Sequence, residues 1–174
     1  MKIKQIEKYI QLYNIENYLF KVVGPNVKEK GYLSFDDFYN ICMWKSVRQK
    51  QNYLKNKNMV EEITKNAFKE DSETEKIDIL CKLKGIGIKT ASAILTVVFP
   101  EKYAVMDERC LDILIDYGFK ISKYASIKTW VLYLNIMRNL AKENNISPRE
   151  LDMAFFAMHK EKLKKENNRN LYRK

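Results

Sequence analysis

The stretch Leu83-Lys84-Gly85-Ile86-Gly87-Ile88-Lys89-Thr90-Ala91 contains two of the five glycines of the chain, one residue apart. Apolar helical patterns flank it on both sides, so it predicts a very tight turn between two helices. Gly85 and Gly87 allow a positive φ and the close approach of another backbone. The first amides of the second helix lack partners within that helix, and the helix dipole favours an anion there. The turn therefore predicts a phosphate-binding site, and an ordinary glycine-terminated helix end is the alternative interpretation.

Helix signals continue in both directions from this turn. Ser72-Glu73-Thr74-Glu75 is a capping box before the turn, and Asp107 can cap the helix that follows the apolar one. Gly24-Pro25-Asn26 should end the first helix, Ser34 should open the next and Ser147-Pro148 the last. We expect helices over about 2–23, from 35 onward, 58–68 with Asn58 as cap, 73–81, 88–99, 107–117, 127–142 and 148–165.

These patterns predict an all-α fold of seven or eight helices. Gly and Pro are rare, and no strong period-two alternation is found. We expect one compact unit over residues 1–174, with the turn and its flanking helices at 77–114 and a frayed basic tail at 166–174.

The composition excludes several kinds of active site. His159 is the single histidine, which argues against Ser-His and Cys-His pairs and against most multi-histidine metal sites. The three cysteines are far apart and form no C-x-x-C pair, which leaves no ligand set for a zinc or iron–sulfur site. Catalysis must then use Lys, Asp, Glu, Ser, Thr or Tyr. No apolar run approaches the ~18 residues of a membrane span, and we expect a cytoplasmic protein.

The net charge of +10 is concentrated in two segments. Residues 45–57 contain five Lys or Arg and no acid, and residues 159–174 contain seven against two acids. Hydroxyl, amide and tyrosine side chains lie between the cations of the first segment, a mixture that suits phosphate contacts through Lys45 and Arg48. A solvated helix end is the alternative interpretation for the second segment.

The stretch Leu-x-Gly-Ile-Gly-x-Lys-Thr-Ala, followed by Ala104-Val105-Met106-Asp107, resembles the helix-hairpin-helix DNA glycosylases. The similarity is to the 8-oxoguanine DNA glycosylases and to endonuclease III, and it covers about residues 79–114. Weaker resemblance extends to 44–48 and 151–154. It implies a helical fold with two lobes around a cleft and the hairpin at the cleft mouth. Cysteines for an iron–sulfur cluster are missing.

The resemblance also implies roles for individual residues. Lys89 would attack C1′ of the damaged nucleotide, and Asp107 would assist. The hairpin would hold a DNA phosphate through Gly85, Gly87 and Thr90, with Lys84 beside them. A monovalent cation would lie on the backbone carbonyls of Cys81, Leu83 and Ile86, and no other cofactor is expected.

The chemistry of these two residues fits such roles. A lysine must be neutral to attack carbon, and at a helix start, partly buried, its pKa should fall. A capping carboxylate at Asp107 is held rigid and kept ionised by backbone amides, so it can stabilise positive charge on the sugar. The alternatives are a surface lysine and a simple helix cap.

We therefore expect a monomeric enzyme that acts on double-stranded DNA containing a damaged, oxidised base or an abasic site. It would remove the base and cleave the strand by β-elimination. Trp44, Tyr53 and Tyr103 are candidates to wedge into or stack on the DNA when the target base leaves the helix. Two alternatives remain, a helix-hairpin-helix protein that binds DNA without chemistry and a monofunctional glycosylase that uses only Asp107.

Overall fold

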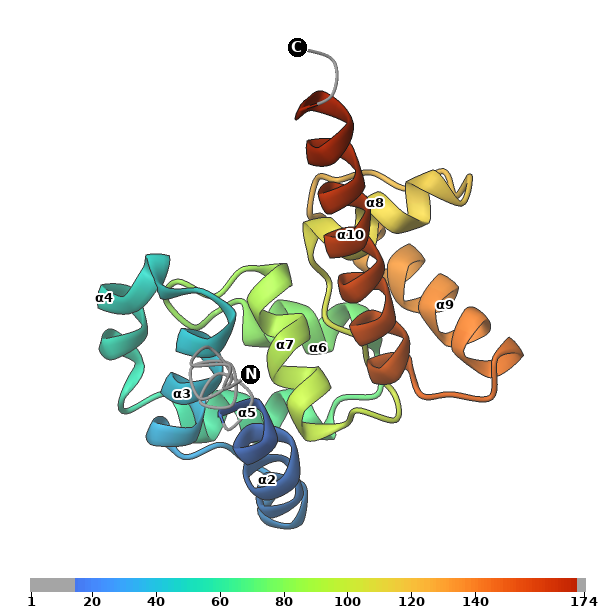
Figure 1. Cartoon of the computed structure of the whole chain (residues 1–174). Helices are drawn as coiled ribbons and strands as arrows, with labels where there is room; N and C mark the ends of the chain where they lie inside the picture. Colours follow the sequence, from blue (N-terminus) through green and yellow to red (C-terminus); the bar gives the residue numbers. More distant parts are fainter. Residues whose placement is uncertain (1–14, 172–174) are drawn as a thin grey trace.

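The computed structural model describes residues 15–171 of the chain, with side chains up to residue 164. Every regular element among these residues is a helix, and none of them forms a strand (Figure 1). The all-α prediction is therefore confirmed. In this part of the chain, no helix is long and apolar enough to cross a membrane.

Helix α7 (Ile88–Val98) lies at the centre of the molecule, and its residues from Thr90 to Val98 are all buried. A helix that is apolar on all sides must be covered on all sides, and α7 has neighbours to match. The neighbours are α2 (Gly24–Lys30), α3 (Phe35–Lys45) and α6 (Glu73–Leu80). Helix α5 (Val60–Lys69) packs on α6 and also contacts α3. The core thus fixes the start of α7, where the glycine turn lies.

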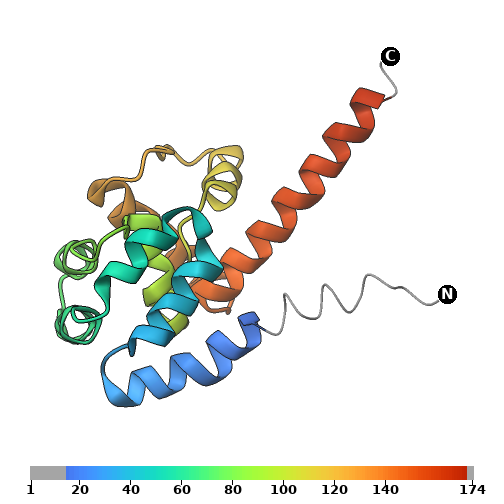
Figure 2. The same ribbon diagram turned by 90° about the vertical axis from the view of Figure 1, so that its left-hand side faces the viewer.

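The last three helices form a second group (Figure 1). Helix α10 (Pro148–Leu171) packs on α8 (Glu108–Asp116) and on α9 (Ile127–Glu143), and α9 also contacts α6. Figure 2 shows α10 as a long helix whose C-terminal part extends away from the other helices. The N-terminal half of α10 remains within the fold and reaches the region between α3 and α8.

All the capping residues predicted from the sequence except Asn58 start their helices. In each case the side-chain oxygen of the cap accepts a hydrogen bond from the backbone N–H three residues later. This bond satisfies one of the unpaired amides of the first turn. The caps are Ser34 to Asp37, Ser72 to Glu75, Asp107 to Cys110 and Ser147 to Glu150.

The prediction that Gly24-Pro25-Asn26 ends a helix is wrong. The chain passes through a π-helical turn, η1 (Leu19–Val23), and continues directly into α2. The Gly24 amide donates to the Leu19 carbonyl, five residues back, and this wider turn makes room for the Pro25 ring. The helix ends only at Lys30.

Gly24 is needed because α2 crosses α7 at close range. A Cβ on Gly24 would lie 2.3 Å from the carbonyl oxygen of Val97. The backbone fixes the positions of both atoms, so a side-chain rotation cannot relieve the clash. We expect Gly24→Ala to lower the free energy of unfolding by about 1–3 kcal/mol, although alanine favours a helix. Urea denaturation measures this, with Asn26→Ala on the exposed side of α2 as the control. Equal stability of the two variants would contradict the close packing.

The structure also differs from the predicted helices in three smaller ways. Met59, not Asn58, precedes α5, and its side chain makes no capping bond. Residues 47–56 form short helical turns that were not predicted: η2 (Val47–Gln49), α4 (Lys50–Tyr53) and η3 (Leu54–Asn56). Helix α10 continues through Leu171, beyond the predicted end at about residue 165. Residues 1–14, with most of the first predicted helix, and 172–174 lie outside the described residues.

Candidate active site

The turn between α6 and α7 has the tight geometry expected of it. Gly85 has φ +82°, a conformation that L side chains rarely adopt, and a Cβ there would lie 2.8 Å from Cβ of Asn52. The Ile86 amide donates to the Leu83 carbonyl at 3.1 Å. The turn therefore rests directly on α4, inside the basic segment 45–57. The two predicted phosphate-binding features are neighbours in space.

Asn56 holds the turn in place, a role that sequence reasoning missed. Its buried side chain accepts the Lys84 amide at 2.7 Å and donates to the Lys84 carbonyl at 2.9 Å. The side-chain NH₂ group of Asn56 also donates to two backbone carbonyls of α4, those of Asn52 and Tyr53. One side chain thus ties the turn to the basic segment. An asparagine in a polar, lysine-rich stretch carries no signal of this contact.

The start of α7 presents backbone amides outward. Thr90 and Ala91 donate to the carbonyl of Gly87, and the Thr90 side chain is buried. The amides of Ile88 and Lys89 are thus the first-turn donors without an intrahelical acceptor. These two amides are therefore the ones that a phosphate could accept from, whereas the Thr90 amide of the predicted site is already engaged. The side chain of Lys84 is exposed beside them.

The predicted cation site needs free carbonyl lone pairs at Cys81, Leu83 and Ile86. The Leu83 carbonyl accepts one hydrogen bond and keeps its second lone pair, so it fits this role. The side chains of Leu83 and Ile86 are buried, which would shield an ion from solvent. The cation stays a prediction. No group of three or more His, Cys, Asp or Glu among the described residues could hold a metal.

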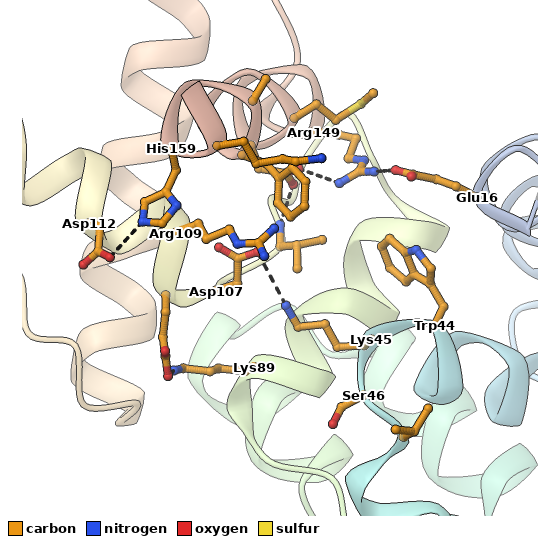
Figure 3. Close-up of a pocket in the computed structure, with 18 of the residues that line it drawn as sticks. Glu16, Trp44, Lys45, Ser46, Lys89, Asp107, Arg109, Asp112, Arg149 and His159 are labelled. Atoms are coloured by element: carbon orange, nitrogen blue, oxygen red, sulfur yellow. Dashed lines mark hydrogen bonds and ion pairs between the residues drawn. The ribbon is translucent and has the colours of Figure 1, made fainter. Parts of the chain in front are cut away.

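A pocket of about 960 Å³ opens beside the start of α7 (Figure 3). Its walls come from the end of α3 with the turn after it, the first turn of α7, the start of α8 with the segment before it, and the inner face of α10; Glu16 adds to the lining. Both predicted catalytic residues, Lys89 and Asp107, line it, as do Lys45 and Arg48. The structure thus brings these four residues together, whereas the turn residues Lys84, Gly85, Gly87 and Thr90 do not line the pocket.

Asp107 is held rigidly at the pocket. Its Oδ1 atom accepts the Cys110 amide at 2.9 Å and so caps α8. The preceding extended segment is fixed from three helices. Ser92 of α7 accepts the Met106 amide, Asp152 of α10 accepts the Val105 amide, and Tyr133 of α9 donates to the Val105 carbonyl. The second oxygen of Asp107 remains on the pocket side.

Two lysines reach the pocket in different ways. Lys45 points at Asp107, with 3.9 Å between Nζ and Oδ2, and its side chain is only 16% exposed (Figure 3). Lys89 is 30% exposed, and its Nζ lies 3.1 Å from Oε1 of Glu108. Burial lowers the pKa of Lys45; Asp107 opposes this shift, and the charge of Lys89 adds to it. Lys45 is therefore largely buried in the pocket, whereas Arg48, which also lines it, remains exposed.

A buried charged pair supports the pocket from α10. The guanidinium of Arg149 bonds to Asp152 and to Glu16, and Figure 3 shows it pointing toward Glu16. Burial raises the pKa of Asp152 to about 7, although Arg149 and the Val105 amide lower it in part. Asp152 bonds both to Arg149 and to the Val105 amide, and it thereby connects α10 to the segment that carries Asp107.

The raised pKa of Asp152 predicts a pH-dependent stability. Because the value of about 7 exceeds the unfolded value of 3.8, the folded state binds the proton more tightly. The resulting stabilisation is complete below the unfolded pKa and is lost as pH rises through about 7. We expect the free energy of unfolding to fall by about 1–3 kcal/mol from about pH 5 to 8. Urea denaturation across this range should show a shallower fall for Asp152→Asn; an identical slope in both proteins would contradict the assignment.

Two of the three predicted stacking residues are in the core. Tyr53 is fully buried, and Tyr103 packs against Trp130 with ring centroids 6.3 Å apart. These two predictions are wrong, because core helices use the apolar faces of both rings. Trp44 does line the pocket, with Phe20 against its edge and Arg149 over its ring.

The α10 wall of the pocket was missed apart from the weak resemblance at 151–154. Arg109 lies over the ring of Phe156, with 4.2 Å between Cζ and the ring centroid. Nε2 of His159 lies 3.2 Å from Oδ2 of Asp112, and the other ring nitrogen, Nδ1, is buried without a hydrogen-bond partner. Only the three-dimensional packing of α10 on α8 brings these side chains to the pocket.

Comparisons with known proteins add no assignment to this geometry. No family model, no curated protein and no solved structure matches the chain.

Proposed function

We propose that this protein is a DNA base-excision repair glycosylase with abasic-site lyase activity, which removes an oxidised base from double-stranded DNA. The observation that carries the proposal is the meeting of Asp107 with the amines of Lys89 and Lys45 in one pocket, beside a glycine turn that offers free backbone amides. This combination supplies a carboxylate, an amine and a phosphate site. Together these are the groups that the reaction needs.

The proposed fold is that of the helix-hairpin-helix glycosylases. Helices α6 and α7 with the turn between them correspond to the hairpin, and the segment before α8 carries the carboxylate. The pocket lies between the end of α3 and the inner face of α10, which agrees with a cleft between two lobes. Residues of both helix groups contribute to it, as an extruded nucleotide would require.

The proposed reaction uses Asp107 as a fixed negative charge. Its cap bond holds the carboxylate in place before the substrate arrives, so little reorganisation is needed in the transition state. There it stabilises the positive charge that develops on the sugar as the glycosidic bond breaks. An amine then forms an imine at C1′, and the resemblance implies Lys89 for this step. β-Elimination of the 3′-phosphate cleaves the strand.

The size and lining of the pocket suit a flipped base. Its volume of about 960 Å³ is within the range of ~300–1,000 Å³ for small-molecule sites. Trp44 and Phe156 place aromatic rings in the lining, with the guanidinium groups of Arg149 and Arg109 over them, and a flipped base would stack on this layer. An enzyme that acts on C1′ must take the nucleotide out of the helix, and such a pocket is where it would go.

The proposed DNA-binding surface consists of the first amides of α7, the turn, and the exposed basic side chains of Lys84 and Arg48. These contacts would be to phosphates, so affinity for undamaged duplex should fall steeply with salt. We expect Arg48→Ala to weaken binding to all sequences alike and to reduce the salt slope by about one unit. Fluorescence anisotropy at several salt concentrations measures it. Lys28→Ala, which breaks an exposed ion pair with Glu101, is the control; an Arg48 slope equal to that of the control would remove Arg48 from the surface.

A panel of duplexes tests the activity itself. Each duplex carries one oxidised purine, one oxidised pyrimidine or a preformed abasic site, and strand breaks are scored without heat or alkali. We expect cleavage at the abasic site and at one class of oxidised base, and none of the undamaged duplex. Binding of all the duplexes without any cleavage or base release would support a non-catalytic DNA-binding protein. Base release without strand cleavage would support a monofunctional glycosylase.

A further inference from the structure

Lys45 lies at the last position of α3, where the next residue, Ser46, leaves the helix in an extended conformation. This break aims the lysine side chain away from the α3 axis and into the pocket (Figure 3). Its Nζ ends near Oδ2 of Asp107, the oxygen that the helix cap does not use. The capping oxygen and the pocket-facing oxygen of Asp107 thus have separate partners.

The separation of 3.9 Å is an ion-pair distance and is too long for a hydrogen bond. The amine of Lys45 is therefore near the carboxylate without being tied to it. A substrate atom can approach the amine without first breaking a hydrogen bond to Asp107. Lys89 differs, because its amine is hydrogen-bonded to Glu108, a residue whose side chain is 77% exposed.

Resting on the proposed function, we infer that Lys45, rather than the hairpin lysine Lys89, is the amine that bonds to C1′ of the abasic sugar. The nitrogen of the neutral amine adds to the aldehyde carbon of the ring-opened sugar. The carbonyl oxygen then leaves as water with the two amine protons, and an imine remains. No oxidant, metal or further reactant takes part in this step.

The electrostatics of the pocket agree with this geometry. Burial is the largest cause of the lowered pKa of Lys45, and Lys89 contributes to it in the same direction. A desolvated lysine beside a second cation is a known way to obtain a neutral, nucleophilic amine near neutral pH. Lys89 would then act on the reaction through its charge and through its position at the start of α7, which orients the DNA.

Adduct mapping on the unaltered protein tests this inference. The protein is incubated with a duplex that contains one abasic site, in the presence of borohydride, which reduces the imine to a stable amine. The adduct is digested and the modified peptide is sequenced by mass spectrometry. We expect the sugar remnant on Lys45. A remnant on Lys89 would overturn the inference and leave the proposed function intact, whereas no adduct at all would overturn both.

Two variants test the same point independently. Lys45→Arg keeps a cation beside Asp107 but cannot form the imine, so the adduct yield should fall at least about tenfold. Lys89→Gln should retain an adduct. Duplex affinity and circular dichroism are measured for both to establish that they are folded and bind DNA. A folded Lys45→Arg protein with an unchanged adduct yield would show that Lys45 acts only through its charge.

Discussion

Asp107→Asn is expected to slow base excision about 100-fold or more, the scale of loss when one preorganised electrostatic group is removed. Asparagine caps a helix about as well as aspartate, so the bond to the Cys110 amide and the stability of α8 should change little. What the change removes is the negative charge on the pocket side. The excision rate on a lesion-bearing duplex measures this effect directly.

The ratio of two rates separates this role from a structural one. Cleavage at a preformed abasic site should suffer less than excision, because the base has already left and only the imine chemistry remains. Asp107→Asn should therefore lower the ratio of excision to abasic-site cleavage. Asp116→Asn, at the far end of α8, is the matched control. If the ratio and both rates stay near those of the unaltered protein, Asp107 is only a helix cap.

Asn56→Ala is expected to lower the free energy of unfolding by about 2–4 kcal/mol. The change leaves the amide and the carbonyl of Lys84 without their buried partner, and each such group costs about 1–3 kcal/mol. It also releases the glycine turn from α4, so binding of duplex DNA should weaken together with stability. Urea denaturation and anisotropy measure the two effects on the same protein.

Asn58→Ala provides the control for Asn56→Ala. Asn58 is exposed and does not cap α5, so its loss should change stability by no more than about 0.5 kcal/mol. Equal stability of the two variants would contradict the role of Asn56 in holding the turn. Normal DNA affinity in a destabilised Asn56→Ala protein would remove the turn from the proposed DNA-binding surface.

Most of the helices could be predicted because their signals are local. The serine caps and Asp107 are short-range patterns, and each starts its helix as expected. The helix at Gly24 could not be predicted, because what decides it is a carbonyl of Val97 far along the chain. Local signals there favour a break, and close packing on α7 overrides them.

The candidate site was predictable only in part for the same reason. The motif around Lys89 and the cap at Asp107 are readable in the sequence, and both line one pocket. Lys45 was expected to contact DNA phosphates, because a lysine in a basic segment carries no mark of burial. Its position follows from where α3 ends against α8 and α10, which depends on the whole fold.

The pocket wall formed by α10 could not be predicted from the sequence either. Phe156 and His159 lie one turn apart on a helix with mixed composition, and nothing in their spacing distinguishes them from other residues of that helix. The packing of α10 on α8 selects one face of the helix, and that face lines the pocket. Long-range packing therefore determines which side chains could recognise the base.

Borohydride trapping on a duplex with a single abasic site tests the central claim most directly, because it detects the covalent bond between a pocket amine and the sugar. We expect a protein–DNA adduct that requires both the abasic site and borohydride, and that is lost when Lys45 and Lys89 are replaced together. The undamaged duplex should give none. A failure of the protein to form any adduct, under conditions in which it binds that duplex, would contradict the claim that this pocket is the active site of a lyase.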